Sequence, residues 1–162
     1  MAFTIRRATA ADAARLARCR LDLFRELTPG PASDIGSAFE DACHATLGQD
    51  LLAGTCVAWL AETPGNGAPI GSLAMLRFPR LPSPRNFRAI EGYVLNVYVV
   101  PAHRHQGIAS ALTQAAIEHA RREKFARLRL HSAPLGRAVY ERAGFYARED
   151  EMELDLADDR RP

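Results

Sequence analysis

The chain has 162 residues, of which 48% are hydrophobic and 25% are charged, and its formal net charge at pH 7 is +2. This composition is that of an ordinary globular domain, and it excludes a disordered segment, a collagen-like repeat and a disulfide scaffold. The near balance of 21 basic and 19 acidic residues argues against a dedicated nucleic-acid binder. We find no apolar run of ~18 residues that would cross a membrane, and we expect no secretory signal.

The first third of the chain predicts one strand and two helices. Apolar and polar residues alternate over residues 3–6, as in a strand. Thr9 is a suitable cap for a helix that carries an apolar stripe at helical spacing as far as Leu27. A proline- and glycine-containing turn follows, and residues 37–52 predict a second helix that Gly54 ends.

The middle third predicts a β-hairpin and a buried strand. Strands over 55–61 and 70–78 are joined by turn-forming residues, and the prolines of 79–84 predict a loop, because proline lacks the hydrogen-bond donor that a central strand needs. Residues 93–100 are apolar on both faces except for Asn96, which is typical of a strand at the centre of a sheet.

The last third predicts two further helices and two further strands or strand pairs. A helix is expected from about residue 106 to 123, and a strand over 127–131. Pro134 suits the first turn of a helix that ends near Ala143. Residues 145–156 predict a final strand or strand pair, and the tail 157–162 is expected to fray. We therefore expect one α/β domain over residues 1–162.

The cysteines and histidines do not form a recognisable metal site. Cys19, Cys43 and Cys56 are an odd number without framework spacing, so we expect reduced thiols in a cytoplasmic protein. Cys43 adjoins a histidine, and His103 and His105 flank Arg104, but neither group has the paired ligand spacing of a zinc site. We expect no metal.

The segment after the buried strand has the features of an anion site. Residues 102–109 connect that strand to a helix, so free backbone N–H groups and the positive end of the helix dipole converge there. Gly107 lets the backbone approach a ligand closely, the small side chain of Ala109 does not obstruct it, and Arg104 can reach a phosphate. A pyrophosphate site is the functional interpretation. A strand-to-helix turn that merely contains glycine and arginine is the alternative.

Two segments carry a resemblance to a known family. Residues 104–109 (RHQGIA) look like the Arg/Gln-x-x-Gly-x-Gly/Ala motif of the GNAT superfamily of acyl-coenzyme A-dependent N-acyltransferases. Residues 139–145 (VYERAGF) resemble its Leu-Tyr-Glu-x-x-Gly-Phe motif, and the region is similar to a common bacterial branch whose members mostly lack assigned substrates. The resemblance implies the single-domain acyl-CoA N-acyltransferase fold, with flanking helices. Its sheet would be mixed and mostly antiparallel, with central parallel strands 93–100 and 127–131 that splay apart.

The resemblance also implies roles for individual residues. The backbone of β-strand residues Val97, Tyr98 and Val99 would bind the pantetheine arm of acetyl-CoA, and a bulge near 96–98 would aim a backbone N–H at the thioester carbonyl. The pyrophosphate would be held by Arg104, His105, Gln106, Gly107, Ile108 and Ala109. Tyr140 would protonate the departing thiolate. Ala133 and Gly136 depart from the family pattern, which has asparagine and alanine there.

Glu91 is the expected general base, and His131 or water are the alternatives. An aliphatic amine has a pKa near about 10, so a base must remove its proton at neutral pH. Glu91 precedes the buried strand in phase with Tyr93, and His131 ends the strand over 127–131. Four arginines before Glu91 are either solvated or favour an acidic acceptor: Arg77, Arg80, Arg85 and Arg88.

The expected function is N-acetyl transfer from acetyl-CoA to a primary amine by direct attack, without a covalent enzyme intermediate. A protein lysine or N-terminal acetyltransferase and a non-catalytic acyl-CoA sensor are the alternatives. The expected partner is an amine-bearing acceptor, and neither nucleic acid nor a membrane is expected. Dimers are common among proteins that look like this one, so a homodimer is left open.

Overall fold

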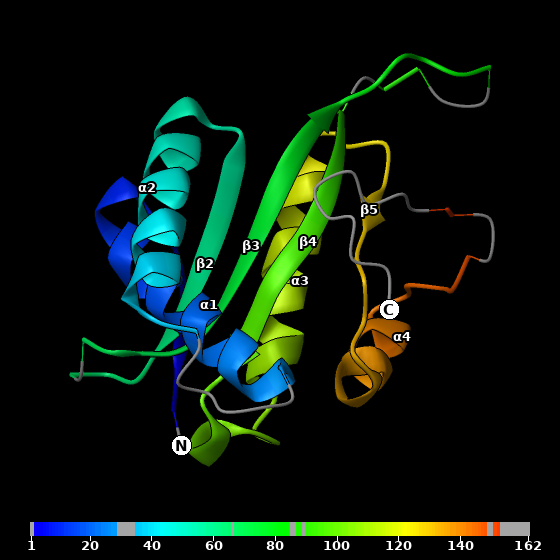
Figure 1. The fold of residues 1–162 in the computed structure, drawn as a ribbon. Coiled ribbons are helices and arrows are strands. Elements are labelled where there is room, and N and C mark those ends of the chain that lie inside the picture. The colour runs from blue at the N-terminus through cyan, green and yellow to red at the C-terminus, as the bar shows by residue number, and fades with distance from the viewer. Residues whose placement is uncertain are drawn as a thin grey trace.

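A five-stranded mixed sheet forms the centre of the molecule (Figure 1). The computed structural model describes residues 2–28, 35–65, 67–84, 87–88, 90–148 and 151–152. The strands are β1 (Thr4–Arg7), β2 (Cys56–Glu62), β3 (Pro69–Pro79), β4 (Ile90–Val99) and β5 (Leu128–Arg129), and they lie in this order in the sheet. β1 to β4 pair antiparallel, whereas β4 and β5 pair parallel. The predicted mixed, mostly antiparallel α/β fold is confirmed.

Helices cover both faces of the sheet. The helices are α1 (Ala13–Leu27) and α2 (Ser37–Ala53) on one face, α3 (Ile108–Arg122) on the other, and α4 (Arg137–Arg142) beyond β5 (Figure 1). Short 3-10 helices precede three of them: η1 (Ala10–Asp12), η3 (Pro101–His103) and η4 (Pro134–Gly136). Each helix within the described ranges is too short or too polar to traverse a bilayer.

Strand β2 lies in the interior and divides the core into two layers. Ala58 and Leu60 pack with Leu16 beneath α1 and α2. Trp59 points to the opposite face and packs with Leu112 of α3. Successive side chains of a strand alternate between faces, so a strand covered by helices on both sides must be apolar throughout. This explains the continuous apolar run in its sequence.

Strand β4 contains a bulge at the place that the family resemblance implied. Leu95 lies opposite Ala74 of β3, but Tyr98 lies opposite Ser72, so β4 has one residue more than β3 between these pairs. Asn96 takes up the extra length with φ +55, a left-handed conformation that asparagine tolerates better than most residues. Its side-chain amide donates to Oγ of Ser72 in β3 at 3.5 Å.

The bulge reverses the alternation of side chains along β4. Val94 and Val97 both pack on the α3 side, although residues three apart in a regular strand point to opposite faces. The Asn96 side chain turns the other way and donates to the carbonyl of Leu16 in α1 at 3.4 Å. The second half of β4 therefore presents Val97 and Val99 to the α3 face and Tyr98 to the α1 face.

Strands β4 and β5 pair over two residues and then diverge. They pair only at Gly92 with Leu128 and at Tyr93 with Arg129. From Val94 onward no strand in the described part of the chain pairs with β4 on its β5 side. A parallel pair that separates in this way leaves the backbone polar groups of one strand edge available to a ligand. The predicted splaying of these strands is confirmed.

Three expectations about the elements need correction. The strand expected over 127–131 is limited to Leu128 and Arg129, because its neighbour β4 diverges and offers no further ladder partner. This strand is also an edge of the described sheet and not a central strand. Residues 145–148 and 151–152 form no strand; the rest of the expected final strand pair, and the tail 157–162, lie outside the described residues.

Candidate active site

The loop between β4 and α3 presents its backbone to the outside. His105 has φ +61 and Gly107 has φ +83, and Gly107 is the N-cap residue of α3. A Cβ built on Gly107 would meet no atom within 4 Å, so the glycine borders open space. The first amides of a helix lack intrahelical acceptors and carry a partial positive charge. This backbone geometry is compatible with an anion, and the predicted anion binding by His105 to Ala109 stays a prediction; we call these residues the phosphate loop.

The side chain of Arg104 fastens this loop to the rest of the fold. Its Nε donates to the carbonyl of Val99 at 3.0 Å, and its Nη2 pairs with Glu26 of α1 at 2.5 Å. The hydroxyl of Tyr98 donates to the same Glu26 carboxylate at 3.1 Å. Burial, followed by this hydrogen bond, raises the pKa of Tyr98 to about 12. Arg104 thus joins the end of β4 to α1, and its predicted contact with phosphate stays a prediction.

Tyr140 lies in α4 and lines a cavity. Its ring packs edge-to-face with Phe145 at 6.0 Å, and a Cβ on Gly136 would come within 3.3 Å of the ring. Burial raises the pKa of Tyr140 above its ordinary value, so the phenol keeps its proton through the neutral range. The cavity, about 800 Å³, lies between α3, β5 and α4 and is also lined by Arg129 and His131.

Glu91 stands at the start of β4 and is surrounded by arginines. Only 7% of the residue is exposed. Its Oε1 pairs with Arg80 at 2.5 Å and with Arg127 at 2.8 Å, and its Oε2 pairs with Arg129 at 3.2 Å. Three guanidinium groups therefore occupy both oxygens of the carboxylate. Glu91 links the end of β3 to β5, and its role as a base stays a prediction.

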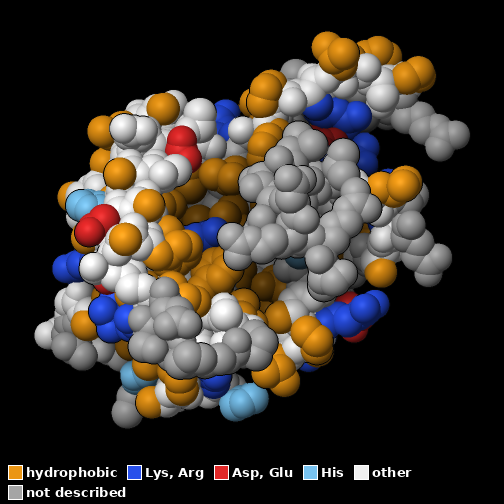
Figure 2. All heavy atoms as spheres, viewed as in Figure 1, with side chains coloured by type: hydrophobic (Ala, Val, Ile, Leu, Met, Phe, Trp, Pro, Cys, Tyr) orange, Lys and Arg blue, Asp and Glu red, His pale blue; other side chains and the backbone are white. Residues whose placement is uncertain are grey.

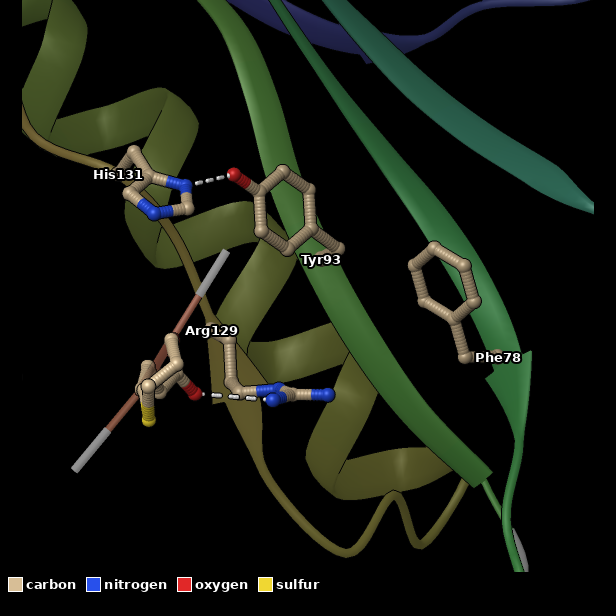
Figure 3. A pocket seen from close by; sticks show the side chains of 6 residues that line it. Phe78, Tyr93, Arg129 and His131 are labelled. Carbon is tan, nitrogen blue, oxygen red and sulfur yellow. Dashed lines mark hydrogen bonds and ion pairs between the residues drawn. The ribbon is translucent and has the colours of Figure 1, made fainter. Parts of the chain in front are cut away.

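His131 lies where two cavities meet. A smaller cavity of about 340 Å³ adjoins the larger one, and Arg129, His131 and Glu151 line both. Figure 3 shows the His131 ring pointing at the hydroxyl of Tyr93, and the two groups form a hydrogen bond through Nδ1 of the imidazole. The Tyr93 ring lies 5.9 Å from the His131 ring, centroid to centroid. The hydrogen bond fixes the orientation of His131 at the boundary between the cavities.

The four arginines before Glu91 do not act as one group. Arg77 donates to the carbonyl of Gly54, and its guanidinium lies 5.7 Å from the ring centroid of Phe125. Arg88 donates to the carbonyl of Phe125, and Arg80 pairs with Glu91. Arg85 lies outside the described residues. The positive charge that reaches the smaller cavity comes from Arg129 instead.

The cysteines are not placed as nucleophiles. Cys19 and Cys56 are buried and free. Burial raises the pKa of both thiols, that of Cys56 to about 11, so neither is a thiolate at neutral pH. Within the described residues, no three metal-ligating side chains gather at one point.

A hollow over the sheet, largely walled by hydrophobic side chains, is visible beside α1 and α2 (Figure 2).

The sequence and the fold both resemble those of known proteins. Residues 21–145 match the family model described as "Acetyltransferase (GNAT) family".

The chain belongs to this GNAT acetyltransferase family.

Solved structures agree with this assignment. A GCN5-related N-acetyltransferase from Ralstonia eutropha is 28% identical, with a TM-score of 0.82 over 97% of this chain and 100% of the other. A predicted acetyltransferase from Clostridium acetobutylicum, solved with acetyl-CoA, is 24% identical, with a TM-score of 0.81 over 96% of this chain and 97% of the other. Glucosamine-6-phosphate N-acetyltransferase from Arabidopsis thaliana has the same fold, with 16% identity and a TM-score of 0.72 over 96% and 99%. None of the curated protein sequences is similar enough to count as a relative.

The GNAT fold brings some of the predicted site residues together and separates others. Tyr140 and His131 line one cavity, and Glu91 adjoins it through Arg129. The phosphate loop lies at the start of α3, and none of its residues lines either cavity. Tyr93 was not predicted as a site residue. Its phase with Glu91 along the strand was the available signal, because it places an aromatic ring on the same face.

Proposed function

We propose that this GNAT protein transfers an acetyl group from acetyl-CoA to a primary amine by direct attack within a ternary complex. The observation that carries the proposal is the joint geometry of β4. The strand has an open edge after Tyr93, a bulge at Asn96, and the phosphate loop at its end. An extended ligand with a diphosphate at one end fits a strand edge that leads to a helix N-terminus.

The residues present fit coenzyme A. Gly107 leaves open space where any side chain would project, and φ +83 is a conformation that glycine adopts without strain. We infer that the amides of His105 to Ala109 bind the pyrophosphate, and that the backbone of Val97, Tyr98 and Val99 binds the pantetheine arm. Acetyl-CoA supplies the reactive thioester.

The chemistry requires an oxyanion donor, an acid and a base. We infer that a backbone N–H at the Asn96 bulge donates to the thioester carbonyl as negative charge develops there. The amine nitrogen forms the new C–N bond as the C–S bond breaks. The Tyr140 hydroxyl gives its proton to the departing sulfur, and the proton of the amine passes to a base. No covalent intermediate on the protein is needed.

His131 is better placed than Glu91 to be that base. It lines the same cavity as Tyr140, whereas both oxygens of Glu91 are held by guanidinium groups. We infer the tautomer in which Nδ1–H donates to the oxygen of Tyr93, because it leaves Nε2 as the lone-pair nitrogen that accepts the proton. Tyr93 is then a positioning residue.

The two base candidates are distinguished by matched substitutions. If His131 is the base, His131→Gln lowers kcat by about 10²-fold or more, while the Kd for acetyl-CoA stays within about twofold. Glu91→Gln lowers the melting temperature instead, because it weakens a buried ion-pair network, and it lowers kcat less. Loss of kcat on Glu91→Gln alone, at unchanged melting temperature, assigns the base to Glu91. Thiol release from acetyl-CoA across a panel of amines gives kcat, and calorimetry gives Kd.

A further inference from the structure

The smaller cavity is walled by aromatic rings from three parts of the chain. Tyr93 of β4 stands between Phe78 of β3 and His131 (Figure 3). The Phe78 and Tyr93 rings meet edge-to-face with centroids 6.4 Å apart. Phe78 is 44% exposed and Met152, at the rim, is 99% exposed. Exposed apolar side chains that line one concave site are typical of a ligand pocket. The aromatic rings of Phe78 and Tyr93 can stack on, or pack edge-to-face against, a planar group of the ligand.

The charges around this cavity favour an anion. Arg129 lines it, with Nη1 2.9 Å from Glu151 and Nη2 3.2 Å from Glu91. Glu91 is buried and shared with Arg80 and Arg127, so three guanidinium groups face two carboxylates. The formal charges of these five described side chains sum to +1. Among the described residues of this network, both carboxylates already have cationic partners, so an incoming carboxylate would complete the pairing.

Glu151 occupies the place that such a carboxylate would take. Its side chain is 48% exposed and pairs with Arg129 at the rim, in contrast to the buried Glu91. An exposed ion pair contributes little free energy, so a ligand can displace it. A carboxylate held by a planar guanidinium group gains two parallel hydrogen bonds. Arg129 is therefore the group on which an anionic ligand would be oriented.

The position of the cavity connects it to the proposed chemistry. Arg129, His131 and Glu151 line both cavities, and the larger one contains Tyr140. A molecule whose ring lies on Tyr93 and whose carboxylate lies on Arg129 would carry an adjacent amine to His131. These three contacts come from neighbouring side chains, since Tyr93 and Arg129 are register partners across β4 and β5.

We propose that the acceptor is a small amine that carries both an aromatic or similar planar apolar group and a carboxylate, as an aromatic amino acid does. Tyr93 and Phe78 receive the ring, and Arg129 binds the carboxylate. The inference rests on the proposed acetyl transfer and names its substrate class. It also moves the acidic-acceptor hypothesis from the arginines before Glu91 to Arg129.

The test compares matched acceptors. L-Phenylalanine has all three groups, 2-phenylethylamine lacks the carboxylate, and L-alanine lacks the ring. We expect kcat/KM for L-phenylalanine to exceed that of either partial acceptor by about tenfold or more, the effect of losing one charge-assisted hydrogen bond or one aromatic contact. Equal kcat/KM for L-phenylalanine and 2-phenylethylamine overturns the assignment of Arg129.

Two substitutions are expected to change KM for L-phenylalanine in opposite directions. Arg129→Gln should raise KM for L-phenylalanine about tenfold or more, whereas Glu151→Gln should lower it, because Glu151 competes for the same guanidinium group. Arg121→Gln, at an exposed position of α3, is the matched control and should leave KM unchanged. An increase of KM in Glu151→Gln contradicts the proposal, since it means that Glu151 itself contacts the acceptor amine.

A binding measurement separates this inference from the proposed function. Saturation-transfer NMR with N-acetyl-L-phenylalanine should show contact of its ring with the protein, and Arg129→Gln should weaken that signal. If acetyl-CoA binds but no amine releases thiol, the proposed acetyl transfer fails. If 2-phenylethylamine or L-alanine is acetylated at least as well as L-phenylalanine, acetyl transfer stands and the substrate class is wrong.

Discussion

Gly107 allows the phosphate loop to be tested against a control within the same chain. Gly107 and Gly54 both have left-handed backbones, with φ +83 and +72. Gly107 begins α3 at the proposed pyrophosphate site, whereas Gly54 ends α2, where a Cβ would approach only Arg77 Nη1 at 4.0 Å. Alanine in this conformation costs about 1–2 kcal/mol. Both Gly→Ala variants should therefore lose similar stability, about 2–4 °C in melting temperature for each kcal/mol.

Binding of acetyl-CoA should separate the two variants. At Gly107 the new methyl group projects into open space that the proposed ligand fills. Loss of one hydrogen bond to the charged pyrophosphate costs about 1.5–3 kcal/mol, which is about a ten- to hundredfold increase in Kd. Gly54→Ala should leave Kd within about twofold. Calorimetric titration with acetyl-CoA measures both, and equal Kd values for the two variants would refute the assignment of the phosphate loop.

Two further predictions concern the acid and the stability at low pH. Tyr140→Phe should lower kcat about tenfold or more, as expected for loss of a general acid, and leave the Kd for acetyl-CoA nearly unchanged; an unaltered kcat in steady-state thiol release excludes Tyr140 as the acid. Hydrogen bonds from Arg6 hold the pKa values of Asp12 and Glu62 below their ordinary range. The two carboxylates therefore contribute fully to the free energy of unfolding above their pKa values in the unfolded chain, and this contribution is lost as pH falls below about 4. Urea unfolding from pH 7 to 2.5 should show this loss, and Arg6→Gln should flatten it; an equally steep decline in the variant contradicts the role of Arg6.

The strand, glycine and helix start of the phosphate loop were predicted from a local sequence pattern, and phosphate binding there stays a prediction; the family resemblance implied the bulge, which the strand register confirms. The loop depends on a strand, a glycine and a helix start that are adjacent in the chain, so it is visible in a short segment. The position of Asn96 is similar: one polar residue interrupts an apolar strand, and the structure gives it φ +55. Features of this kind are fixed by neighbours in sequence and need no knowledge of tertiary contacts.

Contacts between distant segments were less predictable. Glu26 lies far from Arg104 in the chain, and nothing in either segment indicates that the end of α1 pairs with the loop. Glu91 was expected to be the base from its place before the buried strand, but its ion-pair partners Arg127 and Arg129 lie just before β5 and at its end. The length of β5 was overestimated because alternation over 127–131 does not reveal that β4 diverges after Tyr93.

The most direct test of the central claim is amine-dependent release of thiol from acetyl-CoA by the purified protein, followed with a panel of amines that includes L-phenylalanine and lysine-containing peptides. Acetyl transfer predicts that release requires both the amine and the protein, and that mass spectrometry finds one acetyl group added to the amine. Tight binding of acetyl-CoA without thiol release for any amine would contradict the account and would assign the protein to non-catalytic acyl-CoA binding.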